Sequence, residues 1–96
     1  DTHSFSGEVI YIDRFGNLTT NFSEWFMCQN IHRKPIKIKI GSCLITGLKS
    51  HYSEANPREV SALINSWNNI EIFLPSANAA DSLKARVGDV VEIETG

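Results

Sequence analysis

The segment G-E-V-I-Y-I-D-R-F-G-N-L-T-T-N-F, residues 7–22, decides the fold that we expect for this chain. Its first seven residues place Val9, Tyr11 and Asp13 on one face of an extended chain and are rich in β-branched and aromatic side chains. A Phe-Gly-Asn interruption follows, and the last five residues return to an extended pattern. The segment therefore predicts two strands joined by a tight connection.

The rest of the chain repeats this pattern of short strands between turn signals. Residues 35–40 alternate isoleucine with lysine, which predicts one buried and one solvated face. Ser23 is placed to cap a short helix. Further strands are predicted at 43–46, 60–65, 70–74 and 90–93, and a second short helix at 77–83. Six or seven short strands with one or two short helices predict an all-β fold, a small closed Greek-key-like β-barrel.

Composition limits the functions open to the chain. Its 96 residues make one domain, and 42% hydrophobic with 21% charged residues is ordinary globular composition. The formal net charge of −2 argues against a nucleic-acid partner. No apolar run reaches the roughly 20 residues that span a bilayer, so we expect no membrane partner. The chain opens at Asp1 without an initiator methionine, and we expect it to be a piece of a longer protein.

The cysteines and histidines carry no metal-binding pattern. Cys28 and Cys43 form no CxxC pair, and we expect two free, partly buried thiols, with a single disulfide as the alternative. His3, His32 and His51 are scattered along the chain without ligand spacing. We therefore predict no metal site.

Residues 13–17 form the first candidate binding segment. Phe15 offers a flat face for a planar ring, Asn17 presents the donor and acceptor that match the edge of adenine, and Asp13 is suited to an ammonium group. We expect these side chains to face a shared hollow at the rim of the barrel. The alternative is a bulged strand pair in which Phe15 is core and Asn17 makes only turn hydrogen bonds.

Residues 65–69, Asn-Ser-Trp-Asn-Asn, form the second candidate segment. Ser66 and Trp67 follow a predicted strand, where a hydroxyl, an indole and amides can line a pocket. The alternative is an asparagine-rich hairpin with an exposed tryptophan. In either case Asn68 and Asn69 suit a turn that needs a positive φ.

These segments together resemble the C-terminal domain of the S-adenosyl-L-methionine (SAM) hydroxide adenosyltransferase family, which also contains fluorinating and chlorinating enzymes. The resemblance rests on residues 7–22, Tyr-Ser-Glu at 52–54, Ala-Leu-Ile-Asn-Ser at 62–66, Ile-Glu-Ile at 70–72, Ala-Ala at 79–80 and Val-Gly-Asp-Val-Val-Glu-Ile at 87–93. It implies that residues 1–96 are the C-terminal β-barrel of a two-domain protein whose N-terminal α/β domain is absent from this chain. It further implies a cytoplasmic homotrimer whose ligand lies between this barrel and the N-terminal domain of a neighbouring subunit.

The resemblance also implies an activity, the hydrolysis of SAM to adenosine and L-methionine. SAM would be the substrate, with no other cofactor, and the water-activating residues would belong to the missing domain, so this chain alone would be inactive. The implied substrate contacts are Asp13 to the methionine amino group, Phe15 beside adenine, Asn17 on the adenine edge, Tyr52 as a second aromatic wall, Ser66 at the methionine end, and Ser76 and Ala77 near adenine through the backbone. Because Trp67 follows Ser66 directly, we expect it to line the same site, although it departs from the family pattern.

The sequence departs from the family pattern after Ser66. Halogenating members carry arginine at the next position and many hydrolases carry a small residue followed by glycine, whereas this chain has Trp67 and Asn68. The missing arginine favours hydrolysis over halogenation and leaves open which group binds the methionine carboxylate. The alternatives are a SAM-dependent halogenase domain and a non-catalytic ligand-binding or oligomerisation module in which Trp67 closes the pocket.

Overall fold

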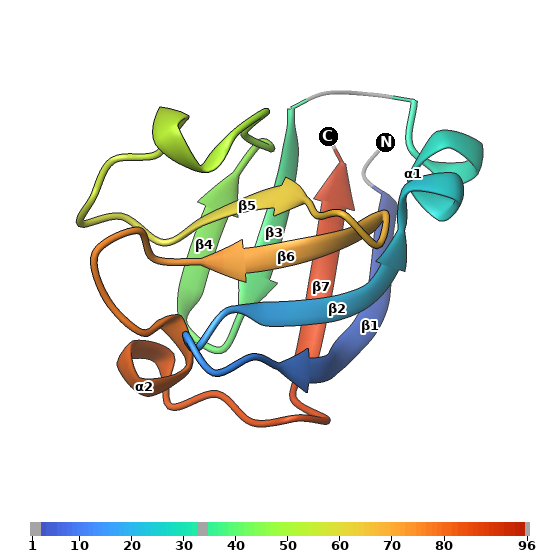
Figure 1. Cartoon of the computed structure of the whole chain (residues 1–96). Coiled ribbons are helices and arrows are strands. Elements are labelled where there is room, and N and C mark those ends of the chain that lie inside the picture. Colours follow the sequence, from blue (N-terminus) through green and yellow to red (C-terminus); the bar gives the residue numbers. More distant parts are fainter. Residues whose placement is uncertain (1–2, 33–34, 96) are drawn as a thin grey trace.

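A computed structural model describes residues 3–32 and 35–95 of the chain. These residues form one seven-stranded sheet that curls into a nearly closed barrel with two short α-helices (Figure 1). The elements are β1 (His3–Ile12), β2 (Leu18–Ser23), α1 (Glu24–Asn30), β3 (Ile36–Ile40), β4 (Cys43–Thr46), the 3₁₀ helix η1 (Tyr52–Glu54), β5 (Ser61–Ile64), β6 (Asn69–Phe73), α2 (Ala79–Leu83) and β7 (Val90–Thr95). The predicted all-β barrel is confirmed.

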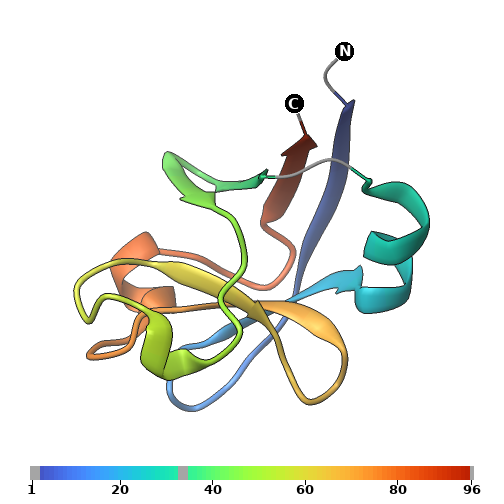
Figure 2. The same ribbon diagram turned by 90° about the horizontal axis from the view of Figure 1, so that it is seen from above.

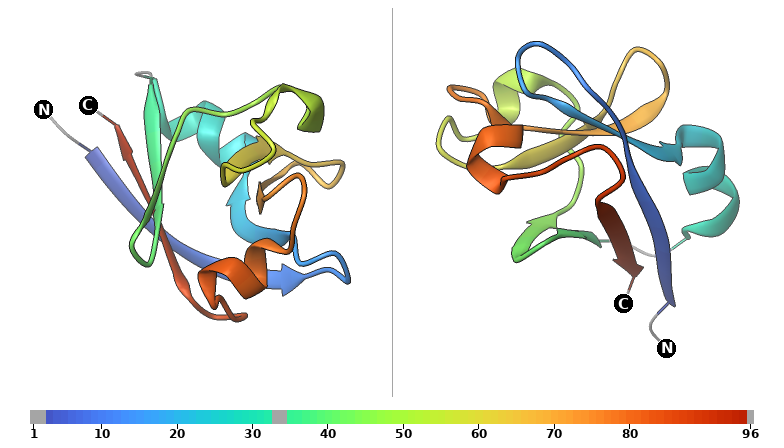
Figure 3. Two further views of the ribbon diagram at one scale, coloured as in Figure 1. Left: turned by 90° about the vertical axis from the view of Figure 1, so that its left-hand side faces the viewer. Right: turned by 90° about the horizontal axis from the view of Figure 1, so that it is seen from below.

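The strands follow the order β4-β3-β7-β1-β2-β6-β5, and each neighbouring pair is antiparallel. The last strand, β7, therefore lies between β3 and β1. The strands β3, β4 and β7 cross β2, β5 and β6 at a steep angle (Figures 1 and 3). A parallel bridge between Lys49 and Leu63 spans the seam between the two outer strands, so the barrel nearly closes.

The core fills the space between these two sets of strands. In β3 the isoleucines are buried and Lys37 and Lys39 are exposed, as the alternation predicts. The buried cluster consists of Val9, Leu18, Phe22, Met27, Ile36, Ile38, Ile40, Ile45, Ala62, Ile70, Ile72, Val91 and Ile93. Burying one such aliphatic side chain contributes about 1.5–3 kcal/mol, so this cluster is the main source of stability.

A β-bulge at Ile10 turns the end of β1 toward a different partner. Up to Glu8 the strand pairs with β7, and from Val9 it pairs with β2. The register runs from Val9 opposite Thr20 to Tyr11 opposite Thr19, which leaves Ile10 as an extra residue. Val9 consequently faces the core while Tyr11 faces outward. The predicted placement of Val9 and Tyr11 on one face is wrong because a bulge shifts the alternation by one residue.

Both helices are capped by side chains. The Ser23 hydroxyl accepts a hydrogen bond from the Phe26 amide at 3.0 Å, as predicted. The Asn78 side chain accepts one from the Asp81 amide at 2.9 Å, so α2 begins two residues later than predicted. The helices lie on opposite sides of the barrel (Figure 2). In the described part of the chain, neither helix has the length and apolar character needed to cross a bilayer.

The turn between β1 and β2 is fixed against α2. Gly16 has a φ of +83°, and its carbonyl accepts a hydrogen bond from the Ala80 amide at 3.0 Å. The side chain of Asn78 lies directly where a Cβ on residue 16 would be. Glycine is therefore required here both by the backbone angle and by the lack of space.

We expect Gly16→Ala to destabilise the domain by about 2–4 kcal/mol, because it adds a strained φ and displaces the helix cap. The matched control is Gly47→Ala, since Gly47 has a φ of +75° and a Cβ added there would meet nothing within 4 Å. That variant should lose only about 1 kcal/mol. Urea unfolding of both variants measures the difference, and equal losses would contradict the proposed packing role of Gly16.

Candidate functional site

The floor of the candidate site is a row of side chains on the outer face of the sheet. Tyr11 lies opposite Thr19, and Thr19 lies opposite Glu71, so the row crosses β1, β2 and β6. Their neighbours Leu18 and Ile72 point into the core. Because successive strand residues alternate between faces, the row must face away from the barrel interior.

One hollow lies above this row, and a second hollow adjoins it. The first hollow, of about 460 Å³, is lined by Tyr11, Asp13, Arg14, Phe15, Thr19, Tyr52, Asn65, Ser66, Trp67 and Glu71. The second hollow, of about 420 Å³, is lined by Phe15, Asn17, Tyr52, Phe73, Leu74, Pro75 and Ala77. Phe15 and Tyr52 line both hollows and therefore stand between them. The two hollows together contain all the predicted contact residues except Ser76.

Three loops build the walls of the first hollow. In the left view of Figure 3 the turn at 13–17, η1 and the turn between β5 and β6 project on the same side of the sheet. The predicted single hollow is divided in two, because Asp13 lines the first hollow, Asn17 lines the second, and Phe15 lines both. The first hollow lies over outward-facing residues of β1, β2 and β6, whereas the second is lined by the turn at 13–17 and the segment after β6.

The turn at 13–17 leaves the side chains of two predicted residues, Phe15 and Asn17, in the walls of the hollows. One carboxylate oxygen of Asp13 accepts hydrogen bonds from the amides of Phe15, at 2.9 Å, and Asn17, at 3.0 Å. Phe15 is 63% exposed, so it is no core residue. Within residues 3–32 and 35–95 the side-chain amide of Asn17 has no hydrogen-bond partner. The bulged-pair alternative is correct about the bulge and about the turn hydrogen bonds of the Asn17 backbone, and it is wrong about Phe15, which is not core.

Glu71 is the buried charge of the site. Only 6% of its surface is exposed, and burying a carboxylate is costly unless it is hydrogen-bonded. One of its oxygens accepts from the Tyr52 hydroxyl at 2.7 Å and the other from the Asn65 side-chain amide at 3.2 Å. The same Asn65 amide lies 3.3 Å from the Thr19 hydroxyl. Glu71 therefore connects the floor to two separate walls.

Asn65 also forms hydrogen bonds within the turn that carries Ser66 and Trp67. Its side-chain oxygen accepts hydrogen bonds from the amides of Trp67, at 3.0 Å, and Asn69, at 3.1 Å. Asn68 has a φ of +63°, as predicted for this turn. The position of Ser66 and Trp67 is therefore set by Asn65, which Glu71 in turn holds in place.

Tyr52 forms the opposite wall. Its ring packs edge-on against Phe73, with 4.9 Å between the ring centroids. Burial, then the hydrogen bond and negative charge of Glu71, and finally the charge of Asp13 raise the pKa of Tyr52 to about 12. The phenol therefore stays protonated near neutral pH, where it acts as a hydrogen-bond donor.

Exposed aromatic rings surround the first hollow. Trp67 is 65% exposed, and its ring centroid lies 5.8 Å from that of Tyr11 with an interplanar angle of 56°. The guanidinium carbon of Arg14 lies 4.9 Å from the centre of the Phe15 ring. The rings of Phe15 and Trp67 nevertheless remain mostly exposed beside the first hollow.

Ser76 is the one predicted residue that the structure does not bring to either hollow. Its hydroxyl donates to the Pro57 carbonyl at 2.6 Å and so ties two loops together. Ala77 does line the second hollow, and its amide donates to the Leu74 carbonyl at 3.2 Å. Ser76 is separated from the hollow because this turn after β6 directs its side chain toward the loop containing Pro57.

Several residues that line the hollows have no individual role in the sequence analysis. Among them are Tyr11, Arg14, Thr19, Asn65, Glu71, Phe73 and Leu74. One feature of the sequence could have drawn attention to Glu71, because it is an acid between two isoleucines in a predicted strand. The role of Tyr11 depends on the bulge and that of Asn65 on contacts with distant residues, so neither follows from local pattern.

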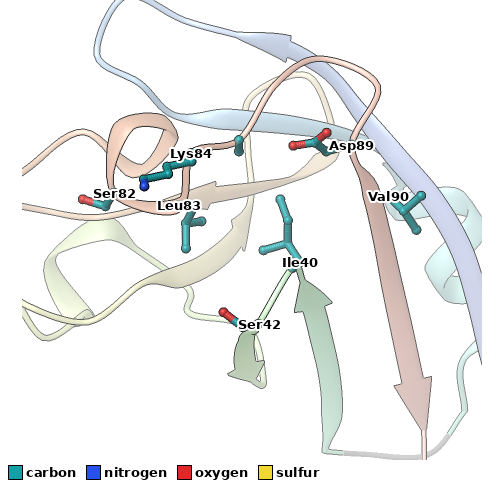
Figure 4. A pocket seen from close by; sticks show the side chains of 9 residues that line it. Ile40, Ser42, Ser82, Leu83, Lys84, Asp89 and Val90 are labelled. Atoms are coloured by element: carbon teal, nitrogen blue, oxygen red, sulfur yellow. The ribbon is translucent and has the colours of Figure 1, made fainter.

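Other hollows contain none of the predicted contact residues. One, of about 600 Å³, separates α2 from the turn between β3 and β4. Figure 4 shows Leu83 and Ile40 reaching into it and Val90 pointing away. Another, of about 740 Å³, is mostly apolar and lies beside α1, where it is lined in part by Cys28. Both cysteines are free thiols, as predicted, and Cys43 is half-buried, but Cys28 is exposed and not partly buried as expected.

Metal-binding side chains do not gather in the part of the chain that the structure describes. Within residues 3–32 and 35–95 no group of three or more histidine, cysteine, aspartate or glutamate side chains is placed to hold an ion. The carboxylates of the first hollow, Asp13 and Glu71, are instead held by amides and a phenol.

Comparisons with known proteins identify relatives of the chain. The model of the family described as SAM hydroxide adenosyltransferase C-terminal domain matches residues 7–92. A crystal structure of an uncharacterized conserved protein from Thermotoga maritima superposes with a TM-score of 0.76 at 22% identity, covering 94% of this chain and 35% of that one. A conserved hypothetical protein from Thermus thermophilus gives a TM-score of 0.71 at 20% identity, covering 92% of this chain and 34% of that one. The comparison with curated proteins found no match.

These two structures have the same barrel fold as this chain, and the sequence identities of 22% and 20% support a likeness of fold alone. The chain spans about a third of the length of each.

We expect Glu71→Gln to lower the pKa of Tyr52 from about 12 toward its ordinary value of 10.0, because the negative charge is removed. Absorbance titration of tyrosinate measures this in a Tyr11→Phe background, which leaves Tyr52 as the only tyrosine. Since the folded pKa is raised, the stabilising contribution of Tyr52 is complete below about pH 10 and is lost as the pH rises toward 12. An unchanged titration in Glu71→Gln would contradict the coupling.

Proposed function

We propose a function from one premise: this chain belongs to the family of SAM hydroxide adenosyltransferase C-terminal domains. The barrel would supply the adenosine- and methionine-binding half of a site that hydrolyses SAM to adenosine and L-methionine in the cytoplasm. The N-terminal domain of a neighbouring subunit in a homotrimer would cover this half and activate the water.

The observation that carries this proposal is the arrangement of the predicted contacts in two adjoining hollows. Asn17 and Ala77 line the second hollow, which suits adenine between the rings of Phe15 and Tyr52. Asp13, Ser66 and Trp67 line the first hollow, which suits the methionine end. Because Phe15 and Tyr52 line both, one extended nucleoside-amino acid ligand can occupy the two together.

The chemistry of the substrate fits a site that binds without transferring protons. Attack at C5′ of the ribose expels methionine as a neutral thioether, so the leaving group needs no proton. The main requirement is to hold C5′ and the sulfur in line with the attacking oxygen. Tyr52, with a pKa of about 12, is no general base near neutral pH. Both hollows are open at the surface of the domain, which is consistent with a second domain supplying the other half.

The test is turnover by the full-length protein that contains this domain. Incubation with SAM in oxygen-labelled water should give methionine and adenosine labelled at the 5′ hydroxyl, as mass spectrometry would show. A 5′-halogenated adenosine formed in the presence of chloride or fluoride would instead identify a halogenase. Absence of any SAM turnover would exclude the enzyme and leave a non-catalytic module.

Asn17→Ala should weaken the binding of SAM to the full-length protein by about 1–3 kcal/mol, because adenine loses a paired donor and acceptor. Isothermal titration calorimetry measures this loss. Asn30→Ala is the control, since Asn30 is an exposed residue at the end of α1 and lines neither hollow. Equal affinities for Asn17→Ala and the unmodified protein would place adenine elsewhere.

A further inference from the structure

We propose that Arg14 binds the α-carboxylate of the methionine part of the substrate and thereby makes the site specific for SAM over its decarboxylated analogue. This inference rests on the proposed function and assigns a specificity role to a residue that the sequence pattern left without one. Halogenating members of the family carry an arginine at the position of Trp67. In this chain Arg14 would supply the positive charge that is missing there.

The charges of the first hollow support this assignment. An amino acid end carries an ammonium and a carboxylate on the same carbon, and a site that desolvates both needs a partner of each sign. Among the ten residues that line the first hollow, Asp13 and Glu71 are acidic and Arg14 is the one cation. Without Arg14 the carboxylate would face two negative side chains and no positive one.

The hydrogen bonds within the first hollow indicate which side chains remain to bind the ammonium and the carboxylate of the ligand. Both oxygens of Glu71 are used, one by Tyr52 and the other by Asn65. Asp13 uses one oxygen for its turn, and in the described part of the chain no group donates to the second, which is therefore free for the ammonium. Ser66 offers a neutral hydroxyl, so charge pairing with the carboxylate falls to Arg14.

The position of Arg14 matches the ligand. It follows Asp13 directly in a turn that is closed by a hydrogen bond of 2.9 Å from the Gly16 amide to the Asp13 carbonyl. Opposite charges on adjacent residues of a fixed turn correspond to opposite charges on one carbon of the substrate. The guanidinium group, held 4.9 Å from the centre of the Phe15 ring, can present its planar fork to a carboxylate.

The experiment compares two ligands in the full-length protein. KM for SAM and the competitive inhibition constant of decarboxylated SAM are measured for the unmodified protein, Arg14→Gln and Arg14→Lys. Arg14→Gln should raise KM for SAM by roughly 10–100-fold and change the inhibition constant of the analogue less than about threefold, because a charged hydrogen-bonded contact is lost only with the carboxylate. Arg14→Lys should recover part of the loss, since it keeps the charge without the fork.

The control variant is Arg86→Gln, which removes an exposed arginine that lines neither hollow and should leave both constants unchanged. If Arg14→Gln weakens both ligands equally, Arg14 only supports Phe15 and the inference is wrong. The inference is equally wrong if neither constant changes. If the unmodified protein does not turn over SAM at all, the proposed function itself fails, which is a different outcome from either of these.

Discussion

The buried carboxylate of Glu71 is the constraint on which the candidate site depends. A carboxylate that is 6% exposed must be hydrogen-bonded, and its partners come from two separate segments, Tyr52 in η1 and Asn65 in the turn after β5. Each hydrogen bond to a charged group is worth about 1.5–3 kcal/mol. Satisfying one buried charge therefore fixes the loop that carries Tyr52 and the turn that carries Ser66 and Trp67 relative to the same floor.

Much of the fold could be predicted because its signals are local. The alternation of isoleucine and lysine in β3, the serine cap of α1 and the positive φ of Asn68 each depend on a few consecutive residues. The candidate turn at 13–17 follows in the same way, from an acid, an aromatic ring and an amide close together. The resemblance then relates this turn to Tyr52 and Ser66, which line the first hollow with Asp13 and Phe15.

The rest of the site escapes sequence reasoning because it depends on register and long-range contacts. One extra residue at Ile10 moves Tyr11 to the outer face, and no local sequence pattern predicts that bulge. Tyr52 and Glu71 are nineteen residues apart and meet only once the loop folds over β6. The first hollow lies over outward-facing residues of β2 and β6, which could not be predicted because strand alternation alone does not say which side of a curved sheet a loop will cover.

The central position of β7 has a consequence for how the domain is made. Its pairing with β1 joins His3 to Thr95, while its other edge holds β3. During synthesis the hairpins of β1 with β2 and of β5 with β6 can form early from nearby residues, but the hairpin of β3 and β4 has no partner strand until β7 arrives. The barrel can therefore assemble only after residues 90–95 leave the ribosome, and such long-range pairing makes folding slower than that of a helical domain of similar size.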